Sequence, residues 1–143
     1  MGSFTEQQED LFKVSDDYTL AHCVGNDFIM GAGIAVEFRK KFGHRQWLMD
    51  NSCGVGTTLL LSSPLIQRNI FYLISKPYSK NSKPSYENIE SCLKDMFKQA
   101  KEKNISKIAM PRIGCGLDGK DWNIVKELIK KHQGDTDVLI QYL

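Results

Sequence analysis

The stretch Met110–Asp118, with the sequence MPRIGCGLD, joins an apolar run to an amphipathic one. The run before it, residues 105–110, has the length and composition of a buried strand, and the run after it, residues 122–132, has the periodicity of a helix. A strand that turns through glycines into a helix gathers backbone N–H groups at the positive end of the helix dipole. In open α/β sheets, ligands bind where such turns leave the carboxyl ends of the strands. The stretch therefore predicts either an anion site, suited to phosphate, or a glycine turn without a ligand.

Apolar runs of strand length alternate with helical patterns on both sides of this stretch. Strands are predicted at residues 18–24, 57–62, 70–75, 105–110 and 138–143, and helices at residues 34–42, 44–50, 85–103 and 122–132. Gly43 is a C-cap candidate for the first helix, and Ser85 is an N-cap candidate for the longest one. The helical stripes place Trp47 and Ile124 among the inward-facing residues. Such alternation is typical of a three-layer α/β/α sandwich with a mixed, mostly parallel central sheet.

The composition is that of an ordinary folded protein. Of the 143 residues, 41% are hydrophobic and 25% are charged, which suits a single domain over residues 1–143, with the polar residues 1–9 expected to be poorly ordered. The net charge of +2 gives little support for nucleic-acid binding, and no apolar run is long enough for a membrane span. The four cysteines lack C-x-x-C spacing, so no metal site is expected. Their apolar neighbours predict reduced thiols, as in the nucleus or the cytoplasm.

A second glycine turn, Gly31-Ala32-Gly33, also stands between a predicted strand and a predicted helix. If the two strands are parallel, both glycine turns lie on the same edge of the sheet, where two sets of backbone N–H groups could hold a diphosphate between them. Neither turn has the spacing of the dinucleotide-binding motif or of a Walker loop.

Four polar side chains have two interpretations each. Lys76 directly follows an apolar strand, so its amine is either a partly desolvated nucleophile or an ordinary lysine that reaches into water. Asp118 follows the glycines and is either the N-cap of the next helix or a carboxylate beside the phosphate site. His22 is either a histidine that packs in the core or behind the residues of a site, or a metal ligand, and Asp10 is either a surface residue or an acceptor for a base amino group. The residues alone leave these alternatives open.

Five motifs, which follow one another at matching distances, carry a family resemblance. They are LAHC at 20–23, MGAGIA at 30–35, YLISK at 72–76, KPSYEN at 83–88 and MPRIGCGLD at 110–118. With them the chain resembles the macrodomain family, above all its small single-domain branch of terminal ADP-ribose protein glycohydrolases, which also deacylate O-acyl-ADP-ribose. The resemblance spans residues 10–143 and implies a macrodomain fold with ADP-ribose in its cleft.

The resemblance also implies a role for each matching residue. Lys76 matches the catalytic lysine that attacks the anomeric carbon of the distal ribose, and Asp118 matches the aspartate that assists and then releases the adduct. The implied substrate-binding residues are Asp10 and Leu11 at the adenine, Gly31, Ala32, Gly33, Ile34 and Ala35 around the distal ribose, Arg112, Ile113, Gly114, Cys115, Gly116 and Leu117 at the diphosphate, and Leu143 at the chain end. His22 and Met30 are also implied to bind the substrate. No cofactor and no metal are implied.

The expected function is therefore that of a hydrolase that removes ADP-ribose from glutamate and aspartate side chains of proteins and deacylates O-acetyl-ADP-ribose. We expect ADP-ribose and ADP-ribosylated proteins as partners, no membrane, and a monomer. The alternatives are a non-catalytic ADP-ribose reader and a phosphatase for ADP-ribose phosphate. The chain departs from the branch before Asp10, because Glu9 replaces a usual glycine and the polar residues 5–8 replace an expected strand.

Overall fold

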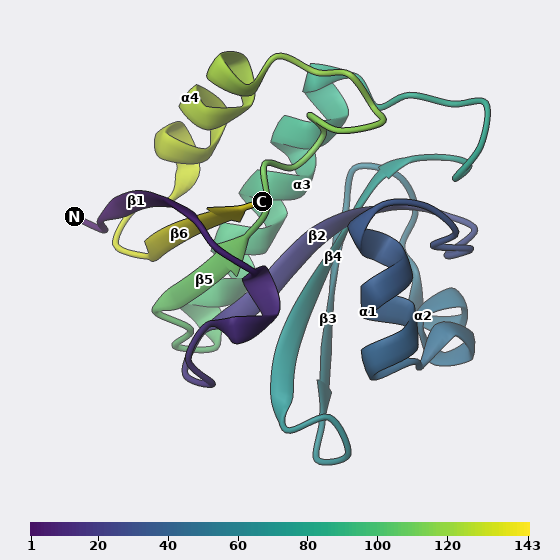
Figure 1. The fold of residues 1–143 in the computed structure, drawn as a ribbon, viewed down its shortest axis with the longest axis horizontal. Helices are drawn as coiled ribbons and strands as arrows, with labels where there is room; N and C mark the ends of the chain where they lie inside the picture. The colour runs from purple at the N-terminus through teal and green to yellow at the C-terminus, as the bar shows by residue number, and fades with distance from the viewer.

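The computed structural model describes all residues 1–143 and contains one six-stranded sheet with helices on both faces (Figure 1). The strands are β1 (Phe4–Gln8), β2 (Thr19–Gly25), β3 (Thr58–Ser63), β4 (Arg68–Lys76), β5 (Lys107–Met110) and β6 (Asp137–Tyr142). The helices are the short 3-10 helix η1 (Leu11–Lys13) and the α-helices α1 (Ile34–Phe42), α2 (Arg45–Asn51), α3 (Tyr86–Glu102) and α4 (Trp122–His132).

The strands lie in the order β1-β6-β5-β2-β4-β3. All neighbours are parallel except β3, which returns antiparallel to β4 through a short turn. This arrangement confirms the predicted mixed, mostly parallel sheet. It brings the carboxyl ends of β2, β4 and β5 to a single edge, and the loops that follow these three strands meet there.

Two hydrophobic cores enclose the sheet, one on each face. Alternate residues of β4 belong to different cores, as the pleat of a strand requires, so Leu73 packs on the side of α3 and α4 while Tyr72 packs on the side of α1 and α2. The strand is buried on both faces, which explains its nearly continuous apolar sequence. Trp47 and Ile124, predicted to face inward, are exposed, because the adjacent Leu48 and Val125 supply the buried face of their helices.

The N-terminal residues form a strand, so the prediction of poor order for residues 1–9 is wrong over Phe4–Gln8. This strand, β1, pairs in parallel with β6 at the edge of the sheet. Its Glu6 side chain accepts hydrogen bonds from Trp122 Nε1 and Lys126 Nζ of α4, both at 2.9 Å. Strand pairing uses only backbone groups, and a strand at the edge of a sheet tolerates polar side chains. The polar composition of residues 4–8 therefore did not indicate a strand.

The remaining elements follow their local signals. Gly43 ends α1 with a φ of 63°, and the Ser85 side chain caps α3 by accepting from the N–H of Asn88. None of the helices combines the length and the apolar character that a bilayer crossing requires.

Candidate active site

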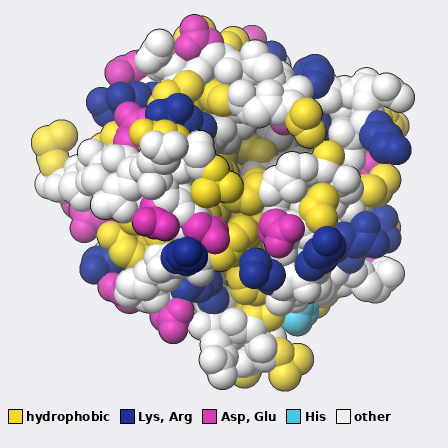
Figure 2. All heavy atoms as spheres, in the orientation of Figure 1, with side chains coloured by type: hydrophobic (Ala, Val, Ile, Leu, Met, Phe, Trp, Pro, Cys, Tyr) yellow, Lys and Arg dark blue, Asp and Glu magenta, His cyan; other side chains and the backbone are white.

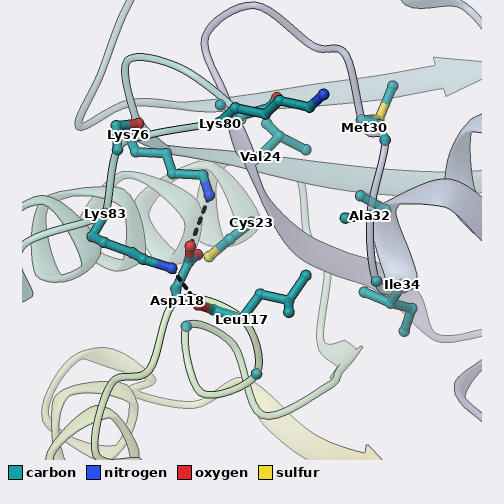
Figure 3. A pocket seen from close by; sticks show the side chains of 18 of the residues that line it. Cys23, Val24, Met30, Ala32, Ile34, Lys76, Lys80, Lys83, Leu117 and Asp118 are labelled. Carbon is teal, nitrogen blue, oxygen red and sulfur yellow. Dashed lines mark hydrogen bonds and ion pairs between the residues drawn. The ribbon is translucent and has the colours of Figure 1, made fainter.

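A cavity of about 540 Å³ opens at the sheet edge where β2, β4 and β5 end (Figure 3). Its lining comes from residues 23–25, 29–35, 76, 79–83, 111–114 and 116–118. Both glycine turns are in this set, so the structure brings together the two segments that the sequence placed on one edge. In the space-filling view the surface is hollowed, with hydrophobic side chains at the floor and charged ones around it (Figure 2). The volume is typical of a site for a small organic ligand.

Lys76 and Asp118 form an ion pair at this cavity. Lys76 Nζ lies 2.7 Å from Asp118 Oδ1, and the two side chains are only 13% and 15% exposed. Lys76 therefore does not reach into open water, and Asp118 does not cap α4, because that N-cap is Asp121. Screening by water is weak for a pair so largely enclosed, so the charges hold each other firmly. The short distance also allows a proton to pass from the amine to the carboxylate.

Lys76 leaves β4 at an irregularity in the sheet. The register between β2 and β4 shifts after Val24, so that Gly25 lies opposite Lys76 and Ser75 is the extra residue. Such bulges redirect the chain and are common beside active sites. Gly25 is required at this position, because a Cβ there would lie 2.7 Å from the backbone nitrogen of Ser79. The lack of a side chain lets the segment after Lys76 cross closely over the end of β2.

Side chains from two helices fix the loop between β2 and α1. Arg45 donates from Nε to the carbonyl oxygen of Phe28 (2.8 Å), and Arg39 donates from Nη1 to that of Ile29 (2.7 Å). Phe28 and Met30 are buried and have positive φ values of 50° and 49°, which non-glycine residues rarely adopt. Buried anchors and charged donors together hold the loop in this unfavourable backbone conformation.

The N-terminus of α1 opens into the cavity without a cap. Gly33 is the N-cap residue, with a φ of 62° and no side chain to accept the first N–H groups of the helix. Ile34 and Ala35 line the cavity, and their N–H groups have no acceptor in the protein. Uncapped N–H groups at the positive end of a helix suit an anionic ligand.

The loop between β5 and α4 supplies the facing set of N–H groups. Its shape rests on backbone bonds of its own, from Lys120 N–H to the carbonyl of Gly114 (2.8 Å) and from Cys115 N–H to that of Arg112 (3.2 Å). The N–H groups of Gly114 and Gly116 donate to no acceptor in the protein, and both glycines line the cavity. With the start of α1, this loop forms a two-sided cradle of the kind that holds a diphosphate.

His22 and Leu11 lie in the core and not at the cavity, contrary to their predicted roles in substrate binding. The His22 side chain is fully buried on the α1 side of the sheet and stacks on Phe38, with the ring centroids 3.7 Å apart. Burial lowers the pKa of His22 to about 3, so the ring is neutral. Leu11 is 3% exposed in the same core. Both residues are apolar or neutral packing groups. His22 is directed inward by the alternation of β2 and Leu11 by the 3-10 helix η1, and the sequence did not show these directions.

Three further predicted residues also lie outside the lining of the cavity. Asp10 caps η1 by accepting from the N–H of Phe12 at 3.0 Å, and the Cys115 thiol donates to the carbonyl of Ile113 at 3.2 Å. Leu143 is the last residue and is 92% exposed. Their contacts with a nucleotide stay predictions.

The structure adds residues that the sequence reasoning did not assign to the site. Residues 79–83 line the cavity, and Lys83 Nζ donates to the carbonyl oxygen of Leu117 (Figure 3). The motif KPSYEN, which begins at Lys83, was the feature of the sequence that could have indicated this segment as part of the site. Cys23 also lines the cavity, and burial raises the pKa of its thiol far above the usual range, so it stays protonated and unreactive. No group of three or more His, Cys, Asp or Glu side chains is placed to hold a metal ion.

Comparison with known proteins identifies the family. The Macro domain family matches residues 21–129. The chain belongs to the macrodomain family. It is 40% identical to human ADP-ribose glycohydrolase OARD1 over 131 residues, which cover 92% of this chain and 84% of the relative. It is 28% identical over 126 residues, or 82% of the chain, to a DNA ADP-ribosyl glycohydrolase of Mycobacterium tuberculosis, of which these residues cover 34%.

The arrangement of the macrodomain elements is shared as well. The macrodomain of Thermus aquaticus DarG superimposes with a TM-score of 0.86 over 100% of both chains, at 24% sequence identity. This likeness confirms the expected fold class. The six-stranded sheet with its four α-helices is therefore the macrodomain fold.

Proposed function

We propose that this macrodomain is a hydrolase that removes ADP-ribose from glutamate and aspartate side chains of proteins and deacylates O-acetyl-ADP-ribose. The observation that carries the proposal is the ion pair of Lys76 and Asp118, 2.7 Å apart at the wall of a cavity with a two-sided cradle of free N–H groups. Relatives that are named ADP-ribose glycohydrolase and DNA ADP-ribosyl glycohydrolase support hydrolysis at an ADP-ribose linkage.

The two-sided cradle supports the proposed binding of the nucleotide diphosphate. The N–H groups of Ile34 and Ala35 at the start of α1 and those of Gly114 and Gly116 in the facing loop have no acceptor in the protein, and all four residues line the cavity. A diphosphate between the two sides would supply the missing acceptors. The ribose beyond the diphosphate would then lie next to Lys76 and Asp118. All these groups come from one chain, so a monomer is sufficient for the reaction. We also propose the nucleus or the cytoplasm as its compartment, where free thiols like those of the four cysteines persist.

The ion pair supplies a nucleophile and a base for the first step. Asp118 takes a proton from the Lys76 ammonium, and the free amine attacks the anomeric carbon of the distal ribose. A C–N bond forms while the bond from the anomeric carbon to the ester oxygen breaks, and its electron pair leaves with the carboxylate of the acceptor. The Asp118 proton passes to solvent before the bond to the ester oxygen breaks, so Asp118 is again a carboxylate at that point. Charge on the sugar in the transition state is stabilised by the adjacent Asp118 carboxylate.

The second step returns the enzyme to its starting state. Asp118 takes a proton from a water molecule that attacks the anomeric carbon. The C–N bond breaks as the water oxygen bonds to this carbon, its electron pair stays on Lys76 Nζ, and Asp118 gives the proton taken from water to the amine. The products are ADP-ribose and a free carboxylate, and the ammonium–carboxylate pair is restored. Acetate is the leaving group when the acetyl group is on the anomeric oxygen.

A substitution of Lys76 tests this assignment. Lys76→Ala should lower release of ADP-ribose from a glutamate-modified protein on the order of 10³-fold or more, because the covalent route is lost. Lys98→Ala, which changes an exposed lysine on α3, is the matched control and should keep full activity. Mass spectrometry of the wild-type protein after incubation with ADP-ribose should find an adduct on Lys76.

Other outcomes would assign other functions. Equal release by the wild type and Lys76→Ala would refute the catalytic roles of Lys76 and Asp118. Tight ADP-ribose binding in calorimetry without any release would indicate a reader. Phosphate release from ADP-ribose phosphate that survives Lys76→Ala would indicate a phosphatase.

A further inference from the structure

The segment that follows Lys76 lines the cavity through residues 79–83. We call residues 77–83, with the sequence PYSKNSK, the strap. Its charged side chains are both lysines, Lys80 and Lys83, and the next carboxylate along the chain is Glu87 in the first turn of α3. The strap is thus a purely cationic segment beside a cavity whose lining contains one carboxylate, Asp118, already paired with Lys76.

Hydrogen bonds fix the strap at both ends. Ser79 donates its N–H to Asp27 Oδ2 at 2.9 Å and its hydroxyl to Asp27 Oδ1, which ties the strap to the loop after β2. Lys83 donates to the carbonyl of Leu117 and ties the other end to the loop that carries Asp118. Ser82 closes the segment between these ties, because its hydroxyl accepts from the N–H of Tyr78 at 3.2 Å and donates to the Tyr78 carbonyl. The tip of the strap is therefore held in a defined position.

Lys80 stands at this tip without a partner in the protein. It is exposed and lines the cavity, and its amine extends over the opening toward the side where Met30 lies (Figure 3). The other cations of the lining are engaged. Lys76 pairs with Asp118, Lys83 bonds a carbonyl, and Arg112 lies 3.6 Å from a Glu6 oxygen and 3.8 Å from the centre of the Tyr142 ring. Lys80 has no hydrogen bond or ion pair of this kind, so its charge is available to a ligand.

We infer that the strap, through Lys80, contacts the protein from which ADP-ribose is removed and selects acceptors with further carboxylates next to the modified residue. This inference rests on the proposed function. In the proposed reaction, the modified carboxylate of the target protein departs from the anomeric carbon beside Lys76. The strap begins at the residue that follows Lys76. No acidic side chain of the protein pairs with Lys80: Asp118 pairs with Lys76, Asp27 accepts from Ser79, and Glu37 of α1 is exposed and outside the lining.

The strap favours an acidic peptide over a polynucleotide. A nucleic-acid track needs a run of cations along the backbone and aromatic platforms for the bases. The strap offers one free lysine and one exposed aromatic ring, that of Tyr78, and the net charge of the whole chain is only +2. One cation held at a fixed point is suited to one or two neighbouring carboxylates.

Matched substrates test the inference. The measurement is kcat/KM for a peptide with one ADP-ribosylated glutamate flanked by Glu and Asp, for the same peptide flanked by Gln and Asn, for O-acetyl-ADP-ribose, and for an ADP-ribosylated single-stranded oligonucleotide. The wild type should prefer the acidic peptide by about 3–10-fold at low salt, less at high salt. In Lys80→Gln the preference should fall to near unity, whereas the control Lys98→Gln should retain it.

Several results would overturn the inference. The first is an equal kcat/KM of the wild type for the two peptides. The second is a loss of kcat/KM in Lys80→Gln that is as large for O-acetyl-ADP-ribose as for the acidic peptide. The third is a loss of kcat/KM in Lys80→Gln that is larger for the oligonucleotide than for the acidic peptide. Affinities measured by calorimetry in the Lys76→Ala background make the test independent of turnover. There the acidic peptide should bind more tightly, and equal affinities would refute the role of Lys80 whatever the catalytic role of Lys76.

Discussion

The two glycine loops of the cavity look alike in sequence but are built differently. The first loop, residues 26–33, is held from outside by Arg39 of α1 and Arg45 of α2, which donate to its carbonyl groups. The second loop, residues 112–118, is held mainly by hydrogen bonds between its own backbone groups and those just after it. A loop of the second kind is encoded locally, whereas one of the first kind depends on residues that lie 10–18 positions along the chain.

The two loops also have different proposed roles in the site, one in the chemical step and the other in ligand binding. The second loop ends in Asp118 and so carries one half of the ion pair that we propose to react, while the first provides the uncapped start of α1 and no proposed catalytic group. Changes in the second loop should therefore affect the chemical step or the fold, and changes in the supports of the first should affect binding. Four predictions test this division.

The largest effect is expected at Asp118. Asp118→Asn keeps the shape of the side chain but removes its ability to take a proton from Lys76, so kcat should fall about 10²–10⁴-fold with ADP-ribose affinity nearly unchanged. Single-turnover kinetics and calorimetry measure the two quantities. Asp121→Asn, a change at the N-cap of α4, is the control for charge loss nearby. An Asp118→Asn protein with near wild-type turnover would contradict the division.

The next effect is expected at Arg45, which supports the first loop. Arg45→Met removes bonds of 2.8 Å to the Phe28 carbonyl and 3.1 Å to the Asp27 carbonyl, and hydrogen bonds of charged donors contribute about 1.5–3 kcal/mol each. ADP-ribose should bind roughly 10-fold or more weakly, with a smaller change in kcat. Lys40→Met on α1, which removes an exposed charge, should bind normally. A fall in kcat without a loss of ADP-ribose affinity in Arg45→Met would contradict the different roles of the two loops.

A smaller effect on stability separates two glycines of the second loop. Gly114 has a φ of 73°, and a Cβ there would lie 3.1 Å from Ile89 Cδ1, whereas a Cβ at Gly116 would meet nothing within 4 Å. Gly114→Ala should lower the free energy of unfolding by about 1–2 kcal/mol, and Gly116→Ala should change it by less than about 0.5 kcal/mol. Urea unfolding measures both. Equal losses would show that the loop is not fixed by local backbone geometry.

The smallest effect is a pH dependence at Asp27 in the first loop. Burial raises the pKa of Asp27, but hydrogen bonds from Ser79 and from the N–H of Ile29 outweigh it and hold this pKa below its ordinary value. A lowered folded pKa means that the carboxylate stabilises the fold above the unfolded pKa of about 3.9, and that this contribution is lost as pH falls through the folded value.

Asp27→Asn should therefore be less stable than the wild type at pH 7, and the difference should narrow below about pH 4. Thermal unfolding at both pH values is the measurement. A difference that stays constant down to about pH 3 would show that the Asp27 charge does not contribute to holding the strap and the first loop.

Much of the fold was predictable because its signals are local. The predicted helix over residues 34–42 has the bounds of α1, since Phe38 fixes the buried stripe and Gly43 ends it with a positive φ. Strand β1 was not predictable, because its polar residues gain order only by pairing with β6 at the other end of the chain. His22 and Lys76 show the same limit within the site. Each lies on a strand and belongs to a motif that resembles the family, but only Lys76 reaches the cavity.

The sequence by itself determined the helices, the caps at Gly43 and Ser85, the glycine turns and the family, because these depend on interactions within a few residues or on ordered motifs. Only the tertiary structure decided that Lys76 and Asp118, 42 residues apart, meet at 2.7 Å, that a purely cationic strap lines their cavity, and that His22 and Leu11 turn into the core. Such contacts follow from the order of the strands in the sheet, which the packing of the whole chain selects and no local pattern specifies.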